Sequence, residues 1–71
     1  MFEKAKLKKD IKRCKAKINF IESKRVRSQA ALVEAILTHA TPKDEDVEFF
    51  NKYTEQIELE RKRLHDLTQM L

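Results

Sequence analysis

The chain has 71 residues, of which 39% are charged and 41% hydrophobic, and its formal net charge is +4 at pH 7. A chain of this length forms one domain with a small core, so we expect a partner to add stability. The sequence has no glycine, one proline and one cysteine, which argues against glycine-rich phosphate loops and excludes a disulfide within the chain.

The first predicted element is a helix over about residues 2–39. Apolar residues recur there in alternating steps of four and three, which is the heptad pattern of a narrow buried seam, with a polar gap in its middle. The stripe consists of Leu7, Ile11, Cys14, Ile18, Ile21, Arg25, Ser28, Leu32, Ala35 and His39.

A turn is predicted at about residues 40–42. Pro42 disfavours a helical conformation at Thr41 and cannot continue a helix interior. We expect Thr41 to cap a second helix and Pro42 to take its first position, followed by acidic residues that suit a helix N-terminus. One continuous kinked helix is the alternative, but another chain would then have to cover both stripes.

The second predicted helix spans about residues 43–71. Its stripe runs through Phe50, Tyr53, Ile57, Glu60, Leu64, Leu67 and Leu71. Together the two stripes predict an all-α fold, an antiparallel two-helix hairpin packed like a coiled coil.

The register of this hairpin is predicted by matching layers across the seam. A short loop places Ala35 opposite Phe50 and brings the off-pattern charges of Arg25 and Glu60 together as a register pair. A shift by one heptad would strand each charge against an apolar residue. The alternative is that both long side chains extend outward independently.

This register leaves residues 1–13 beyond the end of the second helix, and several apolar side chains lie off the seam. Two hairpins packed into a four-helix bundle would cover them, so we expect a homodimer. Docking on a larger protein is the competing solution. The candidate oligomer interface comprises Phe2, Leu7, Ile11, Val33, Ile36, Phe49 and Met70.

Charge is divided unevenly between the two halves. Residues 1–28 hold eleven Lys or Arg and three Asp or Glu, a net charge of +8, whereas residues 29–71 hold five and nine, a net charge of −4. This asymmetry indicates either an anionic partner for the first half of the first helix or charge pairing between the two helices or chains, and we expect such pairing to neutralise part of the basic charge. A basic face around one aromatic residue could bind RNA or DNA. It comprises Lys9, Lys12, Arg13, Lys17, Phe20, Lys24 and Arg27.

Catalytic chemistry is not expected. Cys14, His39 and His65 are the candidates besides scattered carboxylates, and their positions predict no catalytic set, metal site or cofactor site. The isolated Cys14 and the lack of a signal-like or membrane-spanning stretch predict a cytoplasmic protein. Attachment of the basic helix to anionic lipid is a weaker interpretation, since the apolar stripe is needed for packing.

The sequence therefore favours a non-enzymatic helical interaction module. Such a module would oligomerise and bind a macromolecular partner in order to regulate, inhibit or assemble it. The alternative is a small RNA- or DNA-binding regulator that uses the basic face of the first helix.

Overall fold

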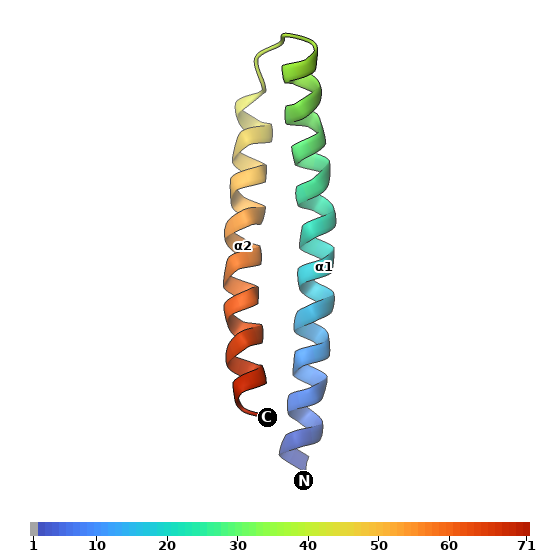
Figure 1. The fold of residues 1–71 in the computed structure, drawn as a ribbon, viewed down its shortest axis with the longest axis vertical. Helices are drawn as coiled ribbons and strands as arrows, with labels where there is room; N and C mark the ends of the chain where they lie inside the picture. The colour runs from blue at the N-terminus through green and yellow to red at the C-terminus, as the bar shows by residue number, and fades with distance from the viewer. Residues whose placement is uncertain (1) are drawn as a thin grey trace.

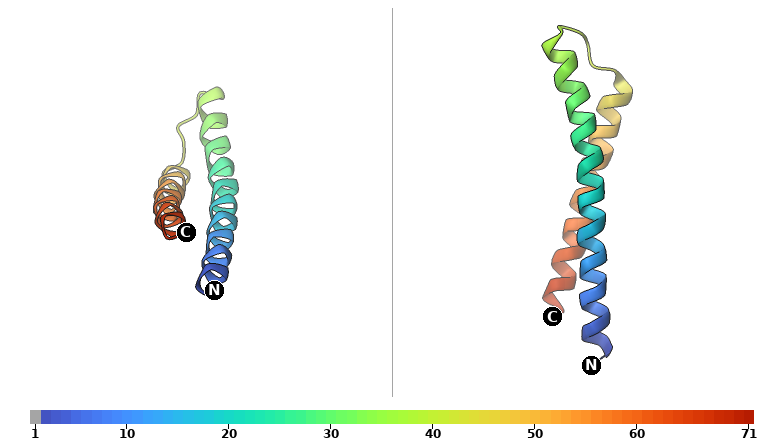
Figure 2. Two further views of the ribbon diagram at one scale, coloured as in Figure 1. Left: turned by 60° about the horizontal axis from the view of Figure 1, so that its bottom comes forward. Right: turned by 90° about the vertical axis from the view of Figure 1, so that its right-hand side faces the viewer.

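The computed structural model describes residues 2–71 and shows two packed α-helices (Figure 1). Helix α1 spans Phe2–Leu37 and helix α2 spans Asp44–Gln69. They run antiparallel in a rod of 57 × 14 × 14 Å, with both chain ends at one end of the rod and the connection at the other (Figures 1 and 2). The predicted all-α hairpin is confirmed for the described part of the chain.

Helix α1 ends in a left-handed turn at His39, whose φ is 58°. The His39 N–H donates to the Ile36 carbonyl at 3.1 Å, and the Ala40 N–H donates to the Ala35 carbonyl at 2.8 Å. This pair of bonds is a Schellman motif, which satisfies carbonyls that the last helical turn would otherwise leave unpaired. The left-handed position of this motif is more often occupied by glycine, a residue type that this chain lacks.

Helix α2 begins later than predicted, because its N-cap is Lys43 and not Thr41. Lys43 has extended backbone angles and makes no side-chain capping bond. Its carbonyl accepts hydrogen bonds from the N–H groups of Asp46 and Val47. Three acidic residues occupy the first turn, where they interact favourably with the helix dipole in place of a capping hydroxyl.

The core lies between the helices in the middle and open end of the rod. Ile57, with 1% of its surface exposed, is the most deeply buried side chain, and its burial contributes about 1.5–3 kcal/mol. Toward the turn the seam is only half-buried, and the Arg25 guanidinium lies 5.5 Å from the centroid of the Phe50 ring. The buried apolar residues are Ile11, Cys14, Ile18, Ile21 and Ile57.

The register differs from the predicted one by about one heptad. Glu60 lies beside Cys14 and Lys17 instead of Arg25, so the predicted register pair is wrong. The cause is the segment 40–43, which precedes α2 and is not helical. It runs back toward the middle of the rod, so α2 begins below the end of α1 (Figure 1). Three extended residues span roughly 10 Å, the length of about seven helical residues.

This shift changes which residues of α1 are covered. Ile11, predicted to lie beyond α2, is buried with 8% of its surface exposed. Leu7 is half-buried and shares a hollow with Leu67 and Met70 at the open end. The predicted overhang of residues 1–13 is therefore too long, because α2 reaches farther along α1 than a short loop would allow.

Candidate interaction surfaces

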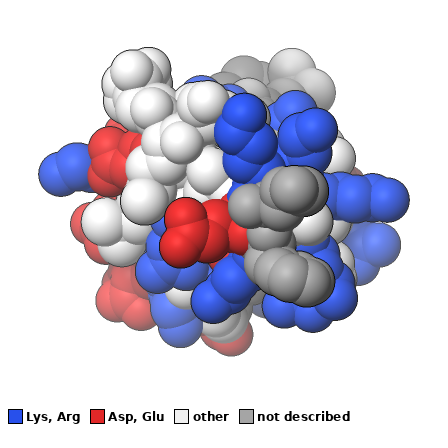
Figure 3. Space-filling model, turned by 90° about the horizontal axis from the view of Figure 1, so that it is seen from below, with Lys and Arg blue, Asp and Glu red and all other residues white. Residues whose placement is uncertain are grey.

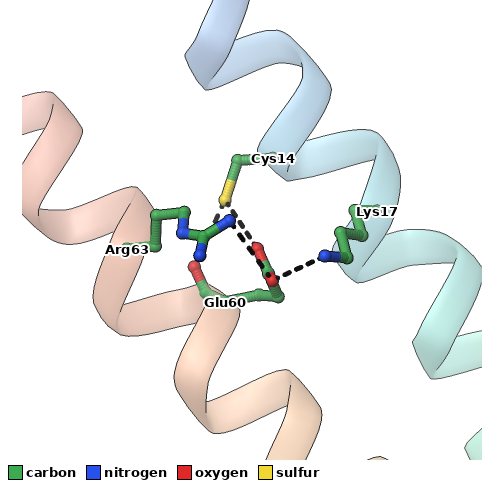
Figure 4. Close-up of polar contacts among 4 residues, drawn as sticks. All are labelled: Cys14, Lys17, Glu60 and Arg63. Atoms are coloured by element: carbon green, nitrogen blue, oxygen red, sulfur yellow. Dashed lines mark hydrogen bonds and ion pairs between the residues drawn. The ribbon is translucent and has the colours of Figure 1, made fainter.

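Glu60 is the one buried charged side chain in the described part of the chain, with 7% of its surface exposed. Its carboxylate lies 2.9 Å from Lys17 Nζ and 3.7 Å from an Arg63 guanidinium nitrogen (Figure 4). The Cys14 thiol donates to the Glu60 backbone carbonyl at 3.3 Å and to its Oε2 atom at 3.6 Å. These contacts tie α2 to α1 at the level of Cys14 and Lys17.

The electrostatics of this cluster favour a charged acid beside a neutral thiol. The hydrogen bond from Lys17 lowers the pKa of Glu60 below its ordinary value of 4.5, and the nearby Arg63 adds to this effect against the opposing cost of burial. Burial raises the pKa of the Cys14 thiol above its ordinary value of 9.0, and the Glu60 carboxylate raises it further. Cys14 is therefore held as a protonated core residue, a poor nucleophile.

An open groove lies next to this cluster, between the two helices. Phe20 is 61% exposed there, and Lys24 Nζ lies 4.6 Å from the centroid of its ring. Across the groove, Tyr53 stacks on Phe49 with their ring centroids 6.2 Å apart. We call this the aromatic groove; its volume is about 320 Å³, and it is lined by Lys17, Phe20, Ile21, Lys24, Tyr53, Gln56, Leu59 and Glu60.

The residues of the predicted basic face are all exposed on α1, but two of them are already engaged. Lys17 pairs with Glu60, and Lys24 lies over Phe20. Seen from the open end of the rod, Lys and Arg side chains gather mainly on the right and lower sides of the view (Figure 3). The remaining basic members of the face are Lys9, Lys12, Arg13 and Arg27.

A second apolar stripe runs along α1 on the side away from α2. Val26 is 60% exposed, Val33 46% and Leu37 75%, and Ala30 is exposed between them. These four residues follow one another in steps of four, three and four, which is again a heptad pattern. We call them the outer stripe. They line a shallow hollow of about 390 Å³ together with Gln29 and Glu34.

The predicted oligomer interface does not form one continuous surface. Val33 belongs to the outer stripe, and the exposed Ile36 lies beside it near the turn. Met70 is exposed at the opposite end of the rod, and Phe49 is exposed against Tyr53. The side chain of Phe2 lies outside the described residues.

Sequence reasoning missed Val26, Ala30 and Leu37 as members of one surface. Their signal is present in the sequence, because from Val26 to Leu37 they follow the same steps of four and three as the inner stripe. It was obscured because residues 30–37 are apolar nearly all round, so that two stripes merge there.

The chain was compared with protein-family models, with curated proteins and with solved structures, and none of them matches. Among the residues that the structure describes, neither helix is both long and apolar enough to cross a membrane. Within residues 2–71, no group of three or more His, Cys, Asp or Glu side chains is arranged to hold a metal ion.

Proposed function

We propose that this protein is a non-enzymatic helical interaction module whose outer stripe binds a helix of a macromolecular partner, so as to regulate, inhibit or assemble it. The observation that carries the proposal is the pair of heptad stripes on α1. Helix α2 covers the inner stripe, and the outer stripe remains exposed. A helix with apolar seams on two sides suits packing between two neighbours.

The energetics favour a covered outer stripe. Leu37 and Val26 expose most of their surface, and complete burial of an aliphatic side chain of this size contributes about 1.5–3 kcal/mol. The spacing of the stripe also restricts its occupant. Steps of three and four match the holes that a second helix presents, whereas an extended strand presents side chains with a period of two.

The experiment compares the wild type with the double variant Val33→Lys, Leu37→Lys. Leu59→Lys is the matched control, because Leu59 is 68% exposed but lines the aromatic groove. Circular dichroism should show that all three chains fold. Chemical cross-linking in the native host, read by mass spectrometry, should show complexes that the double variant loses and the control keeps. If no complex of any kind depends on the outer stripe, the proposal is wrong.

A second candidate function is binding of single-stranded RNA or DNA in the aromatic groove. Phe20 offers an exposed ring beside Lys24, and Tyr53 lies on the opposite wall. Bases stack on aromatic rings while lysines contact the phosphates, so such a groove suits a flexible single strand. The Phe20 substitution described in the Discussion tests this candidate.

A further inference from the structure

We propose that the outer stripe pairs with the outer stripe of a second copy of this chain, in antiparallel orientation and in one specific register. This inference rests on the proposed function, because it identifies the helix that binds to the outer stripe. It follows from the spacing of the stripe and from the two charged residues beside it.

The antiparallel register pairs large side chains with smaller ones. When a two-fold axis passes midway between Ala30 and Val33, Val26 lies opposite the partner's Leu37, and Ala30 lies opposite the partner's Val33. Symmetry repeats both contacts, so the four layers contain apolar residues alone. The contact length is about 18 Å, the rise of twelve helical residues.

The charges beside the stripe select this register. Arg27 follows Val26, and Glu34 follows Val33, so both charges occupy the same flanking position of the heptad. In the proposed register Arg27 meets the partner's Glu34, and the symmetry repeats the pair. A shift by one heptad in either direction would instead oppose Arg27 to the partner's Arg27 or Glu34 to the partner's Glu34.

The charge of the whole rod favours the antiparallel orientation. Residues 29–51, around the turn, hold one basic and five acidic residues, a net charge of −4, whereas residues 1–28 carry +8. A parallel pair would place the two basic segments side by side. In the antiparallel pair these segments point away from each other.

The acidic turns do not oppose the antiparallel pair strongly. The outer stripe faces away from α2, so the two α2 helices lie on the outer sides of the two α1 helices. Neighbouring helix axes are about 8–10 Å apart, which puts the two α2 helices roughly 25 Å from each other. Salt at physiological strength screens charges beyond about 8 Å.

The size of the contact predicts a weak, reversible dimer. Two twelve-residue helical segments bury less than the ~800 Å² per partner of a standard interface. Contacts below this size are typical of transient complexes.

The orientation is tested with single cysteines in a Cys14→Ser background. One chain carries Val26→Cys and another carries Leu37→Cys, and the two are oxidised separately and as a mixture at 200 µM. The proposed register places these two positions opposite each other, so the mixture should form a mixed disulfide. Each chain alone should not form one, because identical positions are offset by about 16 Å along the axis, far beyond disulfide reach.

The register is tested in the same background by charge exchange. Arg27→Glu should lower the yield of the mixed disulfide at least fivefold at low salt, and adding Glu34→Arg should restore it. A disulfide between two copies of the same variant, formed when that variant is oxidised alone, would indicate a parallel pair and overturn the proposal. A monomer at 200 µM with no cross-link would also overturn it. The interaction module is tested separately, by the cross-linked complexes in the native host that Val33→Lys, Leu37→Lys should remove. Neither of the two results above would affect that test.

Discussion

Lys17 and Glu60 form an ion pair of 2.9 Å between the two helices, at a point where the carboxylate is buried and the ammonium is partly exposed. This pair ties the two helices together in the observed register. Glu60 occupies a core position of the α2 stripe, so its charge would be stranded there without the cation.

Lys17→Met should destabilise the hairpin by removing the chief partner of a buried carboxylate. A hydrogen bond to a charged group contributes about 1.5–3 kcal/mol, but Lys17 is 56% exposed and solvent screens the pair, so we expect a loss below that range, about 1 kcal/mol. Chemical denaturation measures this loss. Lys12→Met is the control, since Lys12 is exposed on the same helix. Equal stability of the two variants would show that the pair does not hold the hairpin together.

The stability of the hairpin should depend on the charge of Glu60 in acid. Its pKa is lower in the folded chain than the ordinary 4.5, so its stabilising effect is present above about pH 4.5 and is lost as the pH falls through the lower folded pKa. Glu60→Gln should therefore be less stable than the wild type at neutral pH, and the two stability curves should converge in acid. Urea denaturation from pH 2 to pH 8 checks this. A constant difference across the range would contradict it.

The Cys14 thiol should resist alkylation in the folded protein. It is buried with 5% of its surface exposed, and its raised pKa keeps it protonated at neutral pH. Its stabilising effect as a neutral thiol is present below pH 9.0, the ordinary value, and is lost as the pH rises through the raised folded pKa. Mass spectrometry should show that iodoacetamide reacts at pH 8 far more slowly than in denaturant, in proportion to the small fraction of open hairpin. A rate equal to that in denaturant would contradict this burial.

Phe20→Ala separates nucleic-acid binding from packing. If the aromatic groove binds single strands, this change should weaken binding by ~1–3 kcal/mol and leave its salt dependence nearly unchanged, because stacking releases few counterions. Arg13→Ala should instead reduce the salt dependence. Lys17 is avoided here, since its pairing with Glu60 would confuse binding with stability. Fluorescence anisotropy with labelled oligonucleotides measures the affinity and its salt dependence. Salt-independent or undetectable binding would reject the groove as a nucleic-acid site.

Much of the hairpin could be predicted because its periodicity is strong. The inner stripe from Leu7 to Ala35 and the stripe from Phe50 to Leu67 are buried or half-buried as predicted. His39 and Leu71, the last members of their stripes, are exposed because α1 ends at Leu37 and α2 ends at Gln69.

The register could not be predicted from the stripes alone, because every heptad shift preserves the periodicity. The choice depended on the loop length and on Arg25 as the partner of Glu60. Reasoning that considered core positions alone overlooked Lys17, which reaches Glu60 from the edge of the seam. Arg25 instead lies over the ring of Phe50, an arrangement that keeps a cation half-buried without a carboxylate.

Residue-resolved NMR over a range of concentrations tests the central claim that the outer stripe is an interface between two copies. Between 10 µM and 1 mM, the amide signals of Val26, Ala30, Val33 and Leu37 should shift progressively, while those of the core around Ile57 should stay constant. Shifts centred on Phe20 and Leu59, or constant signals throughout the chain, would contradict the account.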